Sequence, residues 1–155
     1  MKMKKSIVFD SGPVISLAMN SLLWLLPMLK KEFKGDFLIP EGVKKEIIDR
    51  PLKSKRFKFE AMQVLSVVNK GGLKLVRMQK TKKLAEELLD LANSSFTAKR
   101  RKLKLVHPAE IEALALAALK NSSALVVDER TTRLLVENPE KLRKIMEKKL
   151  HTKVS

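Results

Sequence analysis

The chain has 155 residues, of which 33 are lysine or arginine and 17 are aspartate or glutamate, so its net charge is +16. A hydrophobic fraction of 45% is ordinary for a globular protein, and the absence of cysteine excludes disulfide bonds and thiolate metal sites. The charge favours a polyanionic partner, nucleic acid before an acidic membrane. A lysine-rich surface of a heat-stable protein is the alternative, although glutamate does not keep pace with lysine.

Short apolar runs alternate with helical patterns in the first half of the chain. The basic residues of 51–59 predict a loop. Gly71 and Gly72 are expected to end the helix over 61–69. The expected elements are a buried strand at 7–9, a helix over 14–31 that is bent or broken near Pro27, a strand at 36–40, a helix over 41–48 that ends before Pro51, and a helix over 61–69.

The second half continues the alternation. We expect a half-buried strand at 73–78, a helix over 81–93 capped by Thr81, a basic connector at 94–106, a helix over 108–120, a central strand at 125–127, helices over 130–136 and 140–149, and the start of a last strand at 151–155. This order predicts βαβ units and a parallel sheet covered on both faces.

The N-terminus predicts no export or membrane insertion. Basic residues precede only a very short apolar run, which does not have the form of a signal peptide. The apolar stretch 14–29 is interrupted by polar residues and is too short to span a bilayer. We therefore expect a cytoplasmic protein without a membrane partner.

An acid follows each of two apolar runs. Asp10 ends the run in SIVFDSG, and Asp128 ends the run in SALVVDE. Ligands bind at the carboxyl ends of strands in open α/β sheets, so two such acids favour a functional site. Turn formation at the end of a strand is the alternative for each acid taken alone.

Three glutamates lie on predicted helices. Glu46 falls at the border of the buried face that Val43 and Ile47 define, or it is a solvated residue paired with a lysine. Glu110 lies in the first turn of its helix, where the helix dipole also favours an acid. Glu112 is about 200° further round that helix, so both glutamates can hardly point into one site.

The order of these motifs resembles that of a PIN domain, in particular its VapC-like members, over nearly the whole chain. The resemblance rests on FDSGPVISLA at 9–18, LIP at 38–40 followed by Val43 and Glu46, AEIEALALA at 109–117, and LVVDERTTR at 125–133. It implies a single domain over residues 1–155, built as a three-layer α/β/α sandwich with a mostly parallel sheet of about four to five strands.

The resemblance also implies a metal-dependent endoribonuclease that uses Mg²⁺ or Mn²⁺. The family's acids correspond to Asp10, Glu46, Glu110 and Asp128 as the catalytic set, with Glu112 and Glu129 as further metal ligands. The chain departs from the family pattern in several features. The third acid is a glutamate where many members have aspartate, and the chain ends early, so a final strand is expected to be short or absent. The basic stretch 94–104 is longer than in the compact toxins.

RNA is the substrate that the resemblance implies, and basic side chains are expected to hold its phosphates. The sequence leaves open whether the basic runs contact phosphate or are only solvated. The histidine next to Pro108 suits a strand end or a helix cap better than a metal ligand. The substrate-binding set is Ser11, Lys53, Arg56, Lys99, Arg100, Arg101, Lys102, Arg130 and Arg133.

The biological role stays open between a toxin, which would have an antitoxin partner, and an RNA-processing enzyme. The apolar stretch 22–29 suits either a core helix or a homodimer face. The alternative to a nuclease is a nucleic-acid-binding module whose catalytic activity is weak or lost. A phosphatase or response-regulator domain also puts acids at strand ends, but the partner lysine and hydroxyl that it needs are missing at the matching strands.

Overall fold

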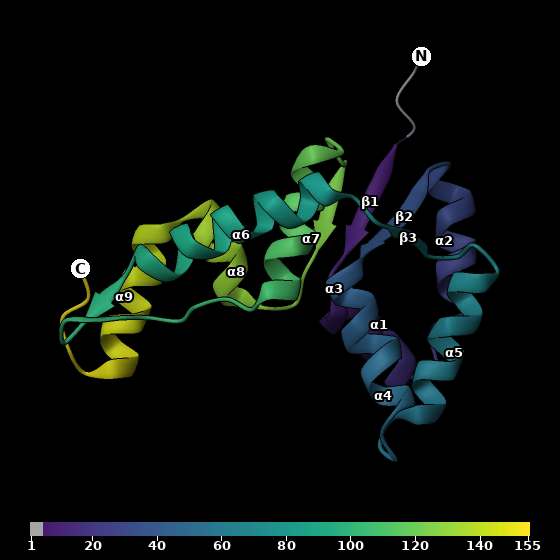
Figure 1. The fold of residues 1–155 in the computed structure, drawn as a ribbon, viewed down its shortest axis with the longest axis horizontal. Coiled ribbons are helices and arrows are strands. Elements are labelled where there is room, and N and C mark those ends of the chain that lie inside the picture. The colour runs from purple at the N-terminus through teal and green to yellow at the C-terminus, as the bar shows by residue number, and fades with distance from the viewer. Residues whose placement is uncertain (1–4) are drawn as a thin grey trace.

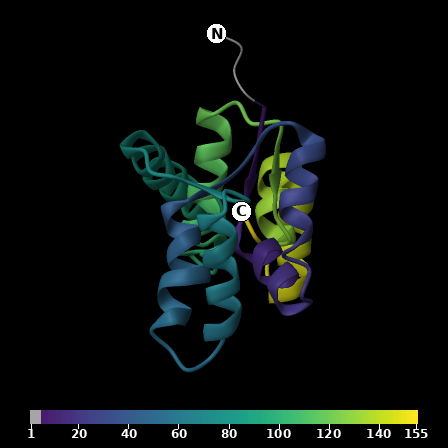
Figure 2. The same cartoon turned by 90° about the vertical axis from the view of Figure 1, so that its right-hand side faces the viewer.

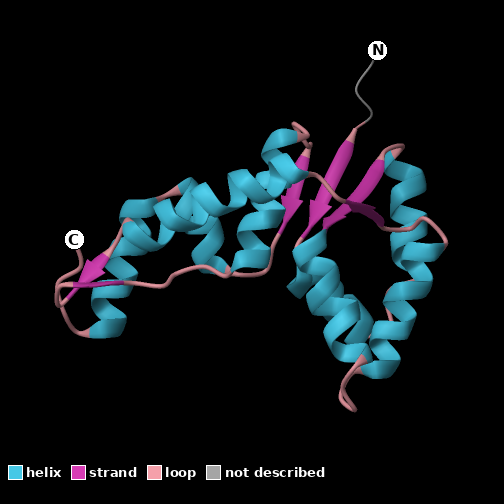
Figure 3. Ribbon diagram, viewed as in Figure 1, coloured by secondary structure: helices cyan, strands magenta, loops and turns pink. Residues whose placement is uncertain are grey.

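A parallel sheet forms the centre of the computed structural model, which describes residues 5–155 (Figures 1 and 3). The basic residues of the N-terminus before Lys5 lie outside the described residues. Within them the sheet has four strands in the order β3-β2-β1-β6, and each neighbouring pair is parallel. The strands are β1 (Ser6–Phe9), β2 (Asp36–Pro40), β3 (Lys74–Val76) and β6 (Ala124–Val126).

The two inner strands are the apolar ones. Nearly every residue of β1 and β2 is buried, as expected for a parallel sheet that helices cover on both faces. The strand expected at 125–127 exists, but its position as a central strand was wrong. β6 is an edge strand with its side chains exposed or half-buried, and it pairs only with β1 among the described strands.

Helices lie on both faces of the sheet and complete three layers (Figure 2). On one face α7 (Pro108–Leu119) packs against β1, β2 and β6, and α3 (Glu41–Lys44) packs beside it. On the other face lie α1 (Ser11–Met19) and α2 (Leu25–Phe33), which bury Val14 and Leu26 in the same core as the strands. The expected α/β/α sandwich is confirmed.

The first helical region breaks at a different place from the one expected. The sequence predicts a helix over 14–31 that is bent or broken near Pro27, whereas α1 ends at Met19 and α2 begins at Leu25. Ser21 adopts a positive φ of 56°, which turns the chain between them. Pro27 lies in the first turn of α2, where a missing N–H breaks no helical hydrogen bond.

The helical segment after β2 changes from α-helical to π-helical at Lys45, one residue before Glu46. It runs from α3 through a π-helical turn (Lys45–Asp49) into α4 (Arg50–Leu52), so Pro51 is helical and the basic loop is shorter than expected. After the loop, α5 (Lys58–Asn69) packs against α1.

The rest of the chain forms an arm beside the sheet (Figure 1). α6 (Gln79–Ser94) packs against α7, and α8 (Arg130–Glu137) against α9 (Pro139–Leu150). Met78 is the N-cap of α6, so the expected cap Thr81 was wrong; it is a buried residue of the first turn. The connector contains a hairpin of β4 (Thr97–Ala98) and β5 (Arg101–Lys102), and the expected last strand is reduced to one bridge between Ala98 and Val154.

None of the helices in residues 5–155 combines the length and the apolar character that crossing a bilayer requires.

Candidate acidic site

Asp10 lies at the C-terminal edge of the sheet, between β1 and α1. Its backbone N–H donates to the carbonyl of Val126 at 3.0 Å, which ties the end of β1 to β6. The side chain is only 2% exposed, and its Oδ1 has no hydrogen-bond partner among the described residues. A buried carboxylate oxygen without a partner costs free energy unless a cation or a proton compensates it.

Three further acids surround Asp10. Burial raises the pKa of Asp10 to about 6, the backbone N–H of Ser11 opposes that shift, and the negative charges of Glu110, Glu46 and Asp128 add to it. The structure therefore brings together the four acids of the expected catalytic set, from β1, the π-helical turn, α7 and the end of β6.

Glu110 is held in place from two helices. Its Oε2 accepts a hydrogen bond from the Thr132 hydroxyl of α8 at 2.7 Å and a weaker one from the backbone N–H of His107 at 3.4 Å. His107 is the N-cap of α7 and forms a capping box with Glu110, as its place before Pro108 suggested. Thr132 is only 2% exposed, so its hydrogen bond from α8 to this carboxylate is shielded from water.

Asp128 is exposed and lies over the first turn of α1. A Cβ atom on Gly12 would overlap both carboxylate oxygens of Asp128, so only glycine allows this approach. The positive end of the α1 dipole favours a carboxylate there. Sequence reasoning missed Gly12 and Thr132. The glycine directly after Asp10 and Ser11 was the one available signal, because Thr132 stands in the polar run ERTTR.

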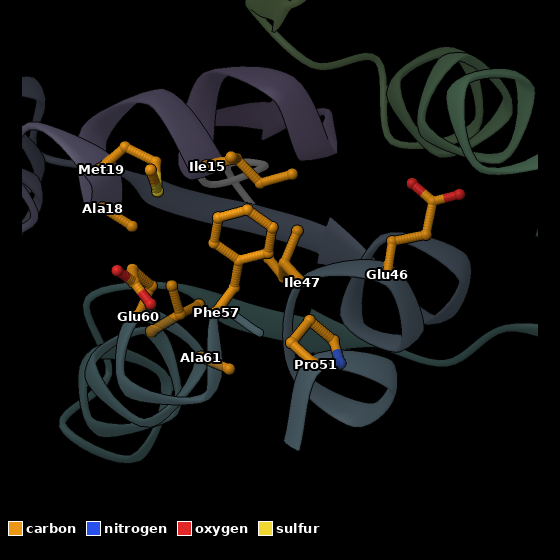
Figure 4. A pocket seen from close by; sticks show the side chains of 10 residues that line it. Ile15, Ala18, Met19, Glu46, Ile47, Pro51, Phe57, Glu60 and Ala61 are labelled. Carbon is orange, nitrogen blue, oxygen red and sulfur yellow. The ribbon is translucent and has the colours of Figure 1, made fainter. Parts of the chain in front are cut away.

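Glu46 is half-buried at the rim of an apolar pocket of about 290 Å³. Figure 4 shows its carboxylate pointing away from the ring of Phe57, which lines the pocket together with Ile15 and Ile47. The Nη1 atom of Arg50, one turn on, is 3.9 Å from Oε1. π-helical turns inside helices are frequent at functional sites, and no pattern in the sequence predicted this one.

Glu112 points to a different place from Glu110, as their helical spacing predicts. Its Oε2 accepts a hydrogen bond from the backbone N–H of Gly42 at 2.9 Å, at the start of α3. Burial raises the pKa of Glu112, and the Gly42 bond lowers it. Asp10 does not appear among the charges that act on it, so the structure brings Glu112 to the α3 side rather than to the four acids.

Glu129 caps α8 instead of facing Asp10. Its Oε1 accepts from the backbone N–H of Thr131 at 3.1 Å, and bonds to Thr131 lower the pKa of Glu129. Arg130 and Arg133 are exposed on the same helix, where Arg133 lies 3.7 Å from Glu137. Ser11 is half-buried in the first turn of α1, next to Asp10.

The other expected substrate-binding residues divide between two ends of the molecule. Lys53 and Arg56 are exposed on the loop before α5, and the Arg56 guanidinium lies 5.8 Å from the centre of the Phe57 ring. The second group lies on the β4–β5 hairpin, at the end of the arm near the C-terminus and away from the four acids (Figure 1). It consists of Lys99, Arg100, Arg101 and Lys102.

The chemistry of the four acids suits a hard divalent cation. Mg²⁺ and Mn²⁺ prefer carboxylate oxygens, and a cation would relieve both the repulsion at Asp10 and its unpartnered Oδ1. As they stand, no three His, Asp or Glu side chains of residues 5–155 are close enough together to hold a metal. The acids gather around Asp10 without forming a closed coordination cage.

The comparisons identify a family. A family model described as a PIN domain matches residues 6–140, which is most of the chain and includes all four acids. No curated protein and no solved structure gives a significant match. PIN domains are generally nucleases that use divalent metal ions, so the family implies a nucleic-acid substrate. The match to the family model, together with the parallel sheet and the acids at its C-terminal edge, shows that this chain belongs to the PIN-domain family.

Proposed function

We propose that this protein is an endoribonuclease that hydrolyses RNA phosphodiesters with Mg²⁺ or Mn²⁺, and that residues 1–155 form one PIN-like domain. The observation that carries the proposal is the buried carboxylate of Asp10, whose Oδ1 has no hydrogen-bond partner among the described residues and whose pKa is raised to about 6 by burial and by three nearby negative charges. A protein that needed Asp10 only to form a turn would gain nothing from burying it among other acids.

The four acids have separable roles in this proposal. Asp10 is the fixed, desolvated ligand, and Glu110, which the Thr132 hydroxyl orients, is the second. Asp128 is exposed and is the ligand that opens toward solvent and substrate. Glu46 is half-buried and accepts a proton from an attacking water or joins the ligand set. A bound divalent cation supplies Lewis acidity toward the phosphate and a more acidic water.

The strong positive charge supports a nucleic-acid substrate, and RNA in particular is proposed from the resemblance to PIN-domain ribonucleases. With 5% aromatic residues and no tyrosine, a platform for stacking bases is not supported, and contact with the phosphate backbone is the expected mode. Arg130 begins α8 two residues after Asp128, and Lys53 and Arg56 lie on the loop that follows the helical segment of Glu46. These residues are proposed to contact the phosphates on either side of the four acids.

A nucleic-acid-binding module with weak or lost catalysis is the second candidate. It is favoured by one specific observation, the lack of a three-ligand cluster among the described residues. In that case the acids would bind Mn²⁺ only weakly and RNA would be bound without being cut.

The experiment combines metal binding with cleavage. Purified protein is titrated with Mn²⁺ by calorimetry and then incubated with a labelled RNA, with and without EDTA. The variants are Asp10→Asn and Asp128→Asn, and the matched control is Asp90→Asn, which removes an exposed carboxylate from α6. We expect the parent and the control to bind Mn²⁺ and cut RNA, and both site variants to lose cutting by at least about a hundredfold. Cleavage by Asp10→Asn at the parent rate would refute the proposal.

The cellular setting is proposed more broadly, as a cytoplasmic toxin or an RNA-processing enzyme. A toxin would have an antitoxin protein as its partner, and a homodimer is a further proposed state. Expression in a bacterial host separates the two roles. A toxin arrests growth and its Asp10→Asn variant does not, whereas a processing enzyme leaves growth unchanged.

A further inference from the structure

The β4–β5 hairpin has an unusual pair of residues in its turn. Two residues, Lys99 and Arg100, join the strands with φ values of 49° and 62°. Turns of this kind need a positive φ at both positions and prefer Asn followed by Gly, because other residues are strained there. Here the strained positions hold two long cationic side chains, and both are exposed.

Backbone hydrogen bonds and buried side chains hold the base of the hairpin in place. Thr97 and Ser155 exchange backbone hydrogen bonds of 2.7 and 3.1 Å, and the Ala98–Val154 bridge follows in the same register. Phe96 and Ala98 are buried in a cluster with Leu142 of α9 and Val154. The turn is therefore held by a packed support rather than carried on a free loop.

The cations of the hairpin lie close to one another and have no carboxylate partner among the described residues. Lys153 is exposed and directly precedes Val154, the residue that bridges to Ala98, so it adds a further cation beside the base of the turn. The two acids of α9, Glu140 and Glu147, both pair with Arg143. Among the ion pairs of residues 5–155, none involves a lysine or arginine of the hairpin.

The hairpin is also distant from the acids. α6 begins beside Glu41, with which Lys82 forms an ion pair just after the end of β2, and it leads from this edge of the sheet out to the hairpin at the end of the arm (Figure 1). Its 16 residues correspond to about 24 Å at 1.5 Å per residue. An RNA that contacts both ends of α6 must therefore be at least about 24 Å long.

We propose that the basic hairpin, defined as Lys99, Arg100, Arg101, Lys102 and the adjacent Lys153, is a second binding surface for the RNA backbone, separate from the acidic site. The inference rests on the proposed function and narrows its substrate class to RNAs long enough to reach from the acids to the hairpin. A fragment of a few nucleotides at the acidic site would not contact it.

The chemistry of the hairpin favours nucleic acid over an anionic membrane. Surfaces that lie on membranes combine cations with exposed apolar side chains that enter the lipid. On the hairpin the apolar residues Phe96 and Ala98 are buried, and its exposed residues are the cations themselves. Such a surface can neutralise phosphates, but it has no exposed apolar side chain that could enter a bilayer.

The test uses a variant that improves the fold while removing charge. Lys99→Asn with Arg100→Gly installs the residues that the turn prefers, so we expect a melting temperature at or above that of the parent. Both proteins are tested with Asp10→Asn added and without metal. The protein with the native hairpin should bind an RNA of about 24 nucleotides much more tightly than one of about 5. In the hairpin variant, the ratio of the two affinities should be roughly tenfold smaller. The log–log salt slope for the long RNA should fall by about 1.4, or 0.7 for each lost contact.

The matched control removes two cations elsewhere. Lys70→Gln with Lys74→Gln changes exposed lysines at the other end of the molecule, at the end of α5 and in β3. The proposal fails if the hairpin variant and this control bind the long RNA equally, if the hairpin variant weakens short and long RNA by the same factor, or if hairpin-dependent binding is found only with phosphatidylserine vesicles. Mn²⁺-dependent cleavage is measured separately, so loss of the nuclease proposal and loss of this one are distinguishable.

Discussion

At the scale of single residues, Asp10 predicts a stability that falls as pH rises. Its folded-state pKa is about 6 against an ordinary value of 3.8, so the folded state keeps a proton that the unfolded state loses between these two pH values. The stabilisation is complete below about 3.8 and is lost as pH passes 6. Asp10→Asn removes this penalty, so at pH 7.5 without metal it should raise the free energy of unfolding by roughly 2–3 kcal/mol.

Urea unfolding in EDTA at pH 7.5 and at pH 4.5 checks this prediction. The gain from Asp10→Asn should shrink at pH 4.5, where Asp10 is already largely protonated in the folded state. The Asp90→Asn control should show no such pH dependence. A variant that is less stable than the parent at pH 7.5 would mean that the Asp10 carboxylate stabilises the fold and is not strained by its neighbours.

Gly12 gives a second prediction at this scale. Alanine favours a helix over glycine by about 1 kcal/mol, so Gly12→Ala should not weaken α1 by itself. Its methyl group would displace the Asp128 carboxylate, and Mn²⁺ affinity should therefore fall while the fold persists. Calorimetry with Mn²⁺ measures the loss, and Ser16→Ala, an exposed change in the same helix, is the control. Unchanged Mn²⁺ affinity in Gly12→Ala would separate Asp128 from metal binding.

At the scale of elements, the sequence predicts what depends on short-range pattern and misses what depends on packing. The apolar runs around Val8 and Leu38 predict their strands, and Pro108 predicts the start of α7, because each is set locally. The proximity of Asp10 and Asp128 followed from the strand pattern, since parallel strands end at one edge, whereas Glu46 and Glu110 were assigned to the same site by the family resemblance. The role of Thr132 depends on the packing of α8 against α7, which brings its hydroxyl to Glu110 and which no local pattern predicts. The hairpin turn of Lys99 and Arg100 was missed because it lacks the Asn-Gly signal by which such turns are recognised.

The tether between α8 and α7 predicts a stability loss at element scale. Thr132→Val keeps the shape of the side chain but removes the buried hydroxyl that donates to Glu110 at 2.7 Å. We expect the free energy of unfolding to fall by about 1–2 kcal/mol, and RNA cleavage to fall because Glu110 loses its orientation. Thr132→Ser keeps the donor and should recover most of the activity. Equal cleavage by the valine and serine variants would show that the hydroxyl does not position Glu110.

At the scale of the whole molecule, the charge of +16 predicts that salt stabilises the free protein. Repulsion among unpaired cations opposes the compact state, and salt screens it, with a Debye length of about 10 Å at 0.1 M. Raising KCl from about 20 to about 300 mM should therefore raise the melting temperature by several degrees, since about 1 kcal/mol corresponds to about 2–4 °C at this size. With RNA bound, the same salt should lower it, because salt weakens the phosphate contacts that stabilise the complex. A melting temperature of the free protein that falls with salt would instead show that ion pairs such as Lys44–Asp49 and Lys82–Glu41 outweigh the repulsion.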